Sequence, residues 1–160
     1  MSTKVYVAGA WSERHERAAP MVVRLCRAGL TITHDWATVV ENEKVKCSDC
    51  ADSGYALGDP ACDRCKGLGI AEPRDADCSP EYRRKHAQSE LVGVRDADIV
   101  WLLACNGDGA VGSWVELGAA LAFHREIVVS GKNCDRTIFT ELVTRRFKSD
   151  EEAFEWIIEQ

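Results

Sequence analysis

The chain has 160 residues, of which 46% are hydrophobic and 29% are charged, and its formal net charge is -6. This length and composition fit one globular domain and exclude a disordered or fibrous protein. The acidic balance argues against a protein that wraps nucleic acid, because phosphate-binding surfaces need clustered Lys and Arg. We therefore expect small-molecule ligands and no nucleic acid partner.

The N-terminal segment lacks the pattern of a signal peptide. Met1 runs directly into the strand-like residues 4–8, with no charged region followed by a run of about 7 to 15 apolar residues. No other stretch approaches transmembrane length. We expect a cytoplasmic protein that does not bind membranes.

The first half of the chain predicts a strand, a helix, a second strand and an insertion. Residues 5–7 form an apolar run that ends at small residues, and residues 18–26 have apolar side chains at helical spacing before Gly29. Pro20 lies either in the first turn of this helix or at a kink, and the first alternative leaves residues 12–17 as loop. Residues 31–36 are predicted to be a second strand. Residues 37–79 are rich in Gly, Asp, Cys and Pro, which is typical of an insertion outside the main core.

The second half alternates helices with strands. The predicted helices cover residues 80–97, 115–123 and a last segment that follows a capping box of Ser149 and Glu152. The predicted strands cover residues 99–104, 127–130 and 137–140. Strands that alternate with helices indicate an α/β fold with a doubly wound, roughly five-stranded parallel sheet in a single domain over residues 1–160.

Four of the eight cysteines form two CxxC pairs separated by eleven residues. Four thiolates can bind one tetrahedral Zn²⁺ and leave no open position for water or substrate, so the predicted zinc is structural. Residues 62–69 resemble one CxxCxGxG unit of the zinc module of DnaJ-type chaperones, which implies a metal-stabilised hairpin and no chaperone activity. Four free or redox-active thiols are the alternative. Cys26 and Cys105 lie in apolar runs and are expected in the core. The predicted zinc ligands are Cys47, Cys50, Cys62 and Cys65.

Three loops are expected at the carboxyl edge of the sheet, where open α/β sheets bind their ligands. They cover residues 9–14, 105–113 and 130–135. Glu116 is predicted at the start of the helix that follows the second of these loops, where the helix dipole favours its ionised form. An ionised carboxylate is what nucleophilic displacement at a sugar carbon requires.

Four segments resemble the nucleoside 2-deoxyribosyltransferase family, which includes N-glycosidases that hydrolyse deoxynucleoside monophosphates. The segments are Val5-Tyr-Val-Ala-Gly9-Ala-Trp11, Ser89-Glu-Leu-Val-Gly93-Val-Arg-Asp-Ala-Asp98-Ile99, Trp114-Val-Glu116-Leu-Gly118-Ala-Ala120 and Ile127-Val-Val-Ser130. The resemblance implies a flavodoxin-like (Rossmann-like) three-layer sandwich and cleavage or transfer at the N-glycosidic bond of a nucleoside or its 5′-monophosphate. It also implies a symmetric homo-oligomer. No cofactor is expected for catalysis.

The same resemblance implies roles for individual residues. Glu116 would attack C1′ of the sugar, Tyr6 would hold that carboxylate by a hydrogen bond, and Glu90 would protonate the departing base. The family usually has Asp at the position of Glu90, and it often has Asp or Ser at the position of Ala110. The residues expected to contact substrate are Gly9, Trp11, Asp108 and Ser113, the last two in place of Ala110.

Each candidate also has a structural interpretation without catalysis. Glu116 would then be a helix-start carboxylate, Tyr6 a core aromatic and Glu90 a solvated helix residue. Arg14 and Lys132 are either phosphate contacts or solvated loop residues. A second hypothesis is a non-catalytic nucleotide-binding or sensor protein whose zinc hairpin docks a partner, and Glu116 distinguishes it from an enzyme.

Overall fold

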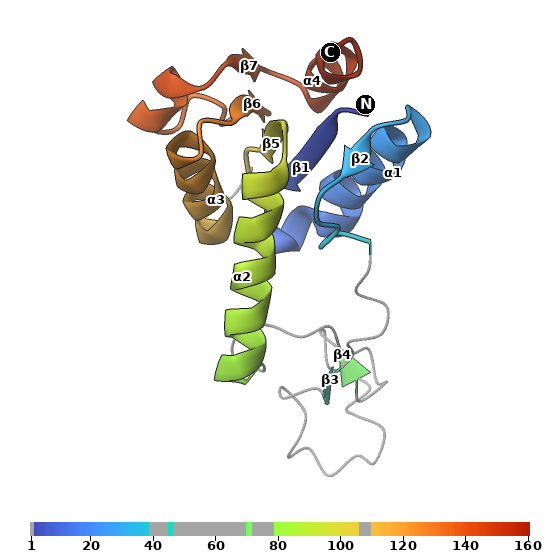
Figure 1. The fold of residues 1–160 in the computed structure, drawn as a ribbon, viewed down its shortest axis with the longest axis vertical. Coiled ribbons are helices and arrows are strands. Elements are labelled where there is room, and N and C mark those ends of the chain that lie inside the picture. The colour runs from blue at the N-terminus through green and yellow to red at the C-terminus, as the bar shows by residue number, and fades with distance from the viewer. Residues whose placement is uncertain (1, 39–44, 47–69, 72–78, 106–109) are drawn as a thin grey trace. The chain divides into compact units, whose positions relative to one another are not determined.

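A computed structural model describes residues 2–38, 45–46, 70–71, 79–105 and 110–160 (Figure 1). The chain divides into two compact units, one formed by Met1–Thr38 with Gln88–Gln160 and the other by Val39–Ala87. Within the described ranges, no helix is long and apolar enough to cross a membrane.

The first unit contains a five-stranded parallel sheet. Its strands in spatial order are β2 (Thr31–Ile32), β1 (Lys4–Ala8), β5 (Ile99–Leu103), β6 (Glu126–Ser130) and β7 (Arg145–Phe147). All five residues of β5 are buried, as its continuous apolar sequence Ile-Val-Trp-Leu-Leu predicts for a central parallel strand. Counted along the sheet, the strand order is 2-1-3-4-5, which is the flavodoxin-like order. The predicted fold class is confirmed.

Helices cover both faces of this sheet, so that the unit has three layers (Figure 1). Side chains alternate along β1: Val5 and Val7 pack with α1 (Ala19–Arg27) and α4 (Asp150–Ile158). Tyr6 and Ala8 point to the opposite face, where they pack with α3 (Val111–Ala122) and the C-terminal part of α2 (Pro80–Asp96). The face that carries Tyr6 is therefore the face covered by α2 and α3.

The segment between β1 and α1 is helical, which the loop alternative for residues 12–17 did not anticipate. Trp11–Glu13 forms the 3-10 turn η1, and Arg14–Ala18 forms a π-helical turn, η2, that continues into α1. Pro20 fits near the start of α1 because its missing N–H is not needed in the first turn.

The second predicted strand is too long, and the fifth is in the wrong place. The second strand ends at Ile32 rather than residue 36. Residues 138–142, predicted in part as the fifth strand, form the 3-10 helix η6 (Ile138–Leu142), whose start is capped by the Thr137 hydroxyl. The true last strand is β7, which pairs with Val128–Ser130 of β6.

Two further sequence predictions concern this unit: the capping box before the last helix and the burial of Cys26 and Cys105. The capping box of Ser149 and Glu152 is confirmed at the start of α4. Cys105 is buried as predicted, whereas Cys26 is exposed, because α1 turns that side of the helix away from the sheet.

The second unit contains a two-stranded antiparallel ladder. β3 (Val45–Lys46) pairs with β4 (Ile70–Ala71), with Lys46 opposite Ile70. Both CxxC pairs fall between these strands in the sequence and lie outside the described residues. Among the residues that the structure does describe, no group of three or more His, Cys, Asp or Glu side chains could hold a metal ion.

Candidate active site

A buried tyrosine and a buried glutamate form the centre of the candidate site. Tyr6 in β1 is fully buried, and Glu116 in α3 is 8% exposed. The Tyr6 hydroxyl donates a hydrogen bond to Oε1 of Glu116 at 2.5 Å. β1 and β5 are the neighbouring strands between which the chain order reverses, and ligands bind at this switch point in such sheets. The hydrogen bond between Tyr6 and Glu116 that the family resemblance implies is present.

Glu116 does not lie at the start of its helix. α3 begins at Val111, after Ala110 in the left-handed conformation with φ of 70°, so that Glu116 lies in the second turn. The effect of the helix dipole falls off within the first turn, and it therefore does little for this carboxyl. The expectation that the dipole keeps Glu116 ionised is wrong.

Burial governs the ionisation of this pair instead. It raises the pKa of Glu116 from 4.5 to about 8; the hydrogen bond from Tyr6 opposes the rise, and the negative charge of Glu90 adds to it. Burial and the Glu116 carboxyl also raise the pKa of Tyr6 well above its usual range. Near neutral pH, burial therefore favours a protonated Glu116 beside a neutral tyrosine.

α2 brings Glu90 and Gly93 to this pair. Glu90 is half-buried, and its charge acts on both Tyr6 and Glu116. Gly93 lies three residues later, on the same side of the helix. A Cβ at Gly93 would lie 2.9 Å from Cδ2 of Tyr6 and 2.6 Å from Cβ of His34. Only glycine lets α2 approach the tyrosine ring this closely.

Two tryptophans stand at the carboxyl end of β1. Trp11 is 43% exposed, and the guanidinium carbon of Arg14 lies 4.4 Å from the centroid of its ring. The Trp36 ring stacks on Trp11 at 6.3 Å, and its N–H donates to the carbonyl of Val7 at 2.6 Å. A Cβ at Gly9 would touch Trp36 at 3.7 Å. Trp11 thus packs against both Arg14 and Trp36 and still keeps part of its surface exposed at this edge.

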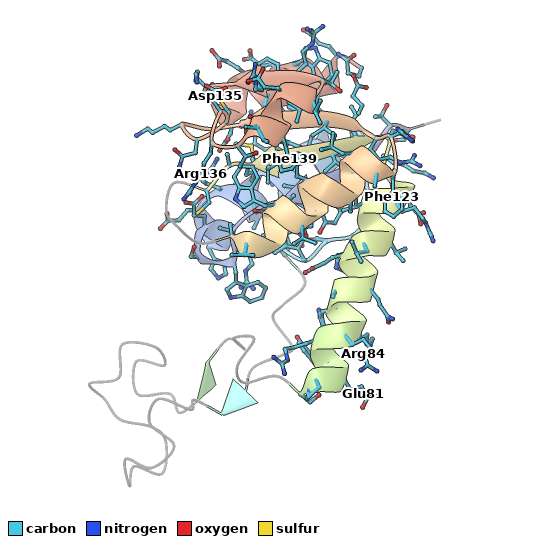
Figure 2. All side chains as sticks on the ribbon, turned by 90° about the vertical axis from the view of Figure 1, so that its left-hand side faces the viewer. Glu81, Arg84, Phe123, Asp135, Arg136 and Phe139 are labelled. Atoms are coloured by element: carbon cyan, nitrogen blue, oxygen red, sulfur yellow. The ribbon has the colours of Figure 1, made fainter. Side chains whose placement is uncertain are left out.

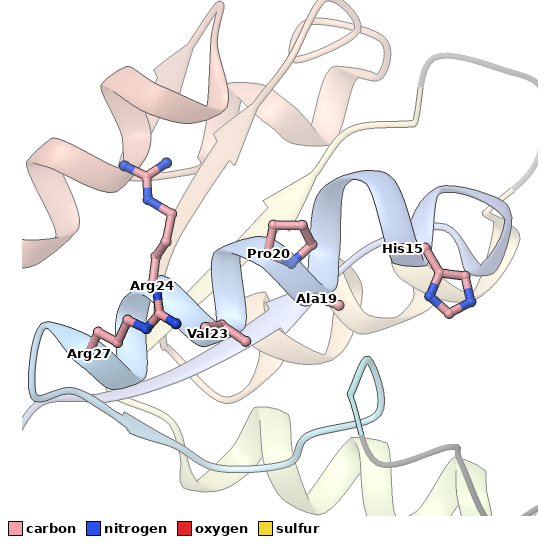
Figure 3. Close-up of a pocket in the computed structure, with 6 residues that line it drawn as sticks. All are labelled: His15, Ala19, Pro20, Val23, Arg24 and Arg27. Atoms are coloured by element: carbon pink, nitrogen blue, oxygen red, sulfur yellow. The ribbon is translucent and has the colours of Figure 1, made fainter.

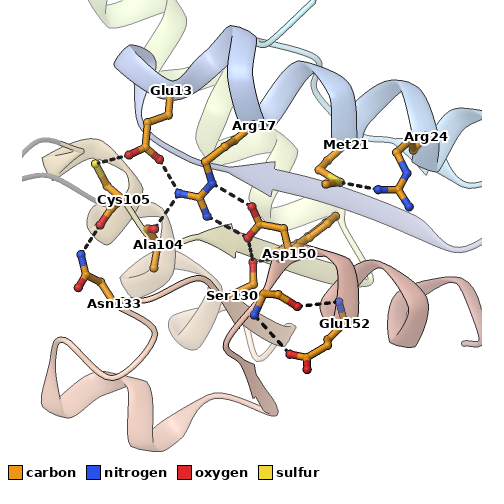
Figure 4. Close-up of polar contacts among 12 residues, drawn as sticks. Glu13, Arg17, Met21, Arg24, Ala104, Cys105, Ser130, Asn133, Asp150 and Glu152 are labelled. Carbon is orange, nitrogen blue, oxygen red and sulfur yellow. Dashed lines mark hydrogen bonds and ion pairs between the residues drawn. The ribbon is translucent and has the colours of Figure 1, made fainter.

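Arg17 connects the segments that frame this edge of the sheet (Figure 4). Its guanidinium forms two hydrogen bonds of 2.9 Å with the Asp150 carboxylate, one with Glu13, and one of 2.9 Å with the carbonyl of Ala104. Gly131, with φ of +105°, leaves room for it, because a Cβ there would lie 2.9 Å from the guanidinium. One side chain thus joins η1, the end of β5 and the start of α4.

Neighbouring side chains extend this network to β6. The Ser130 hydroxyl donates to Asp150 at 2.6 Å and accepts from the Trp101 ring N–H at 2.9 Å. The Cys105 thiol donates to Glu13 at 3.4 Å, and the Asn133 amide donates to the Cys105 carbonyl at 2.6 Å. Residues 104–105 at the end of β5 are therefore joined to the segments that follow β1 and β6.

The other predicted substrate contacts have different surroundings. Ser113 is buried, and its hydroxyl donates to the carbonyl of Ala110 at 2.7 Å, at the start of α3. Asp108 lies outside the described residues. Arg14 is buried rather than solvated, whereas Lys132 is exposed.

A surface hollow on the outer side of η2 and α1 does not coincide with these residues (Figure 3). All of its lining comes from a single helical stretch and includes no carboxylate. The lining residues are His15, Ala19, Pro20, Val23, Arg24 and Arg27. We place the candidate site at Tyr6 and Glu116 because the buried carboxyl and its partner are there.

Comparison with known proteins finds a match among solved structures but none among family models or curated proteins. Among solved structures, the CMP N-glycosidase BcmB of Clostridium botulinum aligns with a TM-score of 0.53 over 99% of this chain and 100% of its own, at 11% identity. The two chains share a fold. At this identity the likeness extends to the fold alone, so activity must be argued from the site.

Sequence reasoning missed three residues that build the site. Arg17 was placed in a stretch that could be loop, Trp36 at the end of a strand, and Gly93 was given no packing role. A glycine inside a helical pattern was the available signal for a close helix–strand contact at Gly93. The partners of Arg17 and Trp36 are distant in sequence and gave no local signal.

Proposed function

We infer that the protein cleaves or exchanges the N-glycosidic bond of a nucleoside or nucleoside 5′-monophosphate, with Glu116 as the nucleophile. The observation that carries this proposal is the 2.5 Å hydrogen bond between two buried side chains, Tyr6 and Glu116, at the switch point of the sheet. A fold shared with a CMP N-glycosidase supports it.

In the first half of the reaction, the ionised Glu116 attacks C1′ of the sugar. The C1′–N bond breaks, its electron pair passes to the base, and a glycosyl ester forms on the carboxylate. The Tyr6 hydroxyl donates to Oε1, which fixes the carboxylate and leaves Oε2 for the attack. Glu90 is close enough for its charge to act on Glu116. The reactive form carries one proton, which is on Glu90 rather than on Glu116, and this proton passes to the departing base.

In the second half, an acceptor attacks C1′ of the ester and releases Glu116. Water as the acceptor gives hydrolysis, and a second base gives transfer with the same retention at C1′. Trp11 would hold the base in either case, because its exposed ring lies beside the carboxyl end of β1.

A non-catalytic nucleotide-binding protein is the second candidate. The raised pKa of Glu116 favours it, because a protonated carboxyl is a poor nucleophile and a good hydrogen-bond donor to a bound ligand. The two candidates differ in whether any base is released.

The test incubates the protein with a panel of ribo- and deoxynucleosides and their 5′-monophosphates, and it measures free base by chromatography. Base release that disappears in Glu116→Gln supports the enzyme, as does a covalent sugar adduct on wild-type protein in intact-mass spectra. Equal release by both proteins would exclude Glu116 as nucleophile. Binding of a nucleotide without base release at any pH between 6 and 9 would support the second candidate.

A further inference from the structure

α2 is held to the sheet over a small buried surface near its C-terminal end. Of its described residues only Gly93 and Val94 are buried, whereas Leu91 and Val92 are 40% and 45% exposed. Val94 joins the core cluster that includes residues of α3, and Figure 2 shows this end of α2 beside Phe123, at the end of α3. Hydrophobic burial is not directional, so a surface this small leaves the helix free to shift along its support. A hydrogen bond at this place can therefore decide where α2 lies.

Thr33 supplies such a bond from the end of β2. Its hydroxyl donates to the Gly93 carbonyl at 2.8 Å, and its backbone N–H donates to the Val5 carbonyl at 3.0 Å. Val5 directly precedes Tyr6 in β1. A single residue therefore joins the strand that carries Tyr6 to the helix that carries Glu90.

The Thr33 hydroxyl holds α2 at the point where the helix rests on the Tyr6 ring. A Cβ at Gly93 would lie 2.9 Å from Cδ2 of Tyr6 and 3.0 Å from Cε2, so the backbone of Gly93 packs directly on the ring. Glu90 lies one turn before Gly93 on the same side of α2, and its charge acts on Glu116. The backbone hydrogen bonds of a helical turn keep its residues in fixed relative positions. A movement of α2 at Gly93 would therefore carry Glu90 with it.

We propose that Thr33 is a positioning residue, whose hydroxyl fixes the approach of α2 to Tyr6 and thereby places Glu90 beside Glu116. The inference rests on the proposed function, in which Glu90 gives its proton to the departing base. Thr33 needs no contact with the substrate for this role, because it acts through the Gly93 carbonyl.

The alternative is that the Thr33 hydroxyl only stabilises the fold. Such a bond adds the same free energy of unfolding at every pH, and its contribution does not depend on residue 90. A bond that positions α2 instead changes how strongly the Glu90 charge acts on Glu116, because the interaction between two charges weakens as they move apart. The two roles therefore differ in the coupling between Thr33 and Glu90.

The experiment is a double-mutant cycle of Thr33→Val and Glu90→Gln in the full chain. Valine keeps the branched shape of threonine and removes the hydroxyl. Urea unfolding over a pH series gives the pH at which the stability linked to Glu116 is lost. Glu90→Gln should lower this pH in the wild type, and in Thr33→Val it should lower it by about half as much or less. The neighbouring Tyr6 and His34 are the same in every variant.

Three further variants separate the hydroxyl from the shape of the side chain. Thr33→Ser keeps the hydroxyl and should restore the full effect of Glu90→Gln. Thr31→Val makes the same exchange at an exposed threonine of β2 and should leave that effect unchanged. Thr33→Ala lacks both the hydroxyl and the methyl group, so it should reproduce Thr33→Val, and it replaces the valine variant if that protein does not fold.

Base release gives a second readout, on the substrate that the panel of nucleosides and nucleotides identifies. A reacting group that is displaced by about 1 Å costs up to about a hundredfold in rate. We expect Thr33→Val to lower kcat by about ten- to a hundredfold with little change in KM, because Glu90 would act in the transition state. Thr33→Ser should recover most of this loss.

Three results would overturn the inference. The first is a folded Thr33→Val or Thr33→Ala protein in which Glu90→Gln keeps its full effect on the pH of stability loss. The second is a Thr33→Ser protein that behaves like Thr33→Val, and the third is a wild type in which Glu90→Gln has no effect on this pH. A wild type that releases no base from any substrate would refute the proposed function instead, and the unfolding cycle would still decide whether Thr33 positions Glu90.

Discussion

Replacement of Glu116 with glutamine should abolish catalysis and also remove the destabilisation that a buried, ionised carboxylate causes. Glutamine keeps the length of the side chain, and its amide oxygen can still accept the hydrogen bond from Tyr6. The amide cannot ionise and cannot act as the nucleophile. We expect Glu116→Gln to release no base and to be more stable than the wild type at alkaline pH.

The magnitude follows from the pKa of the buried carboxyl. The pKa is 4.5 for an ordinary Glu and about 8 here, a difference of about 3.5 units, and at about 1.4 kcal/mol per unit this gives roughly 5 kcal/mol. The folded state binds the proton more tightly than the unfolded state. The associated stability is therefore fully present below pH 4.5 and is lost as the pH rises to 8. The glutamine variant has no such loss.

Urea unfolding between pH 4.5 and 9, followed by circular dichroism, measures this difference. We expect the free energy of unfolding of Glu116→Gln to exceed that of the wild type by a gap that widens by several kcal/mol from pH 5 to pH 8. Glu159→Gln, at an exposed carboxyl, is the matched control and should follow the wild type. Parallel curves for wild type and Glu116→Gln would refute the burial argument.

Three further predictions concern the surroundings of this carboxyl, the contact at Gly93 and the insertion. Tyr6→Phe should raise the pKa of Glu116 further, because the hydrogen bond that lowers it is lost, whereas Glu90→Gln should lower that pKa by removing a nearby negative charge. The pH at which the stability linked to Glu116 is lost should therefore rise in Tyr6→Phe and fall in Glu90→Gln, and shifts of the same sign would contradict this account. Gly93→Ala should lower stability by about 1–3 kcal/mol, because its Cβ meets the Tyr6 ring; an unchanged melting temperature would show that α2 moves away freely. Freshly purified protein should contain one Zn²⁺ per chain by elemental analysis, lost when the CxxC cysteines are replaced by serine, and protein without zinc would contradict the predicted structural site.

The sequence was most informative where local pattern decides the structure. The apolar runs of β1, β5 and β6 and the capping box at Ser149 identified the central strands and the last helix. The β-branched and aromatic residues 137–140 favour a strand, yet β7 lies at Arg145–Phe147. Residues 145–147 form a strand because they pair with β6, which is distant in the sequence. Local β-propensity does not include this pairing.

Only part of the candidate site could be predicted, because the rest also depends on contacts between residues that are distant in the sequence. Family resemblance paired Tyr6 with Glu116, and the structure places the two in contact. The ionisation of Glu116 was predicted with the wrong sign, because α3 starts four residues before the predicted position at Val115 and because burial is a tertiary property. The close approach at Gly93 depends on how α2 crosses β1, which periodicity alone does not define.

The Arg17 network determines how the carboxyl edge of the sheet opens. Breaking the contact of Arg17 with any one segment leaves a half-buried charge or a buried carbonyl without its partner, so no loop gains by opening alone. The segments that follow β1 and β5 and the start of α4 should therefore open as one cooperative unit, with one shared free energy of amide hydrogen exchange. The side chains at this edge of the sheet are therefore already held in place before a ligand binds. Its loops become ordered when the protein folds, and not when it binds a ligand.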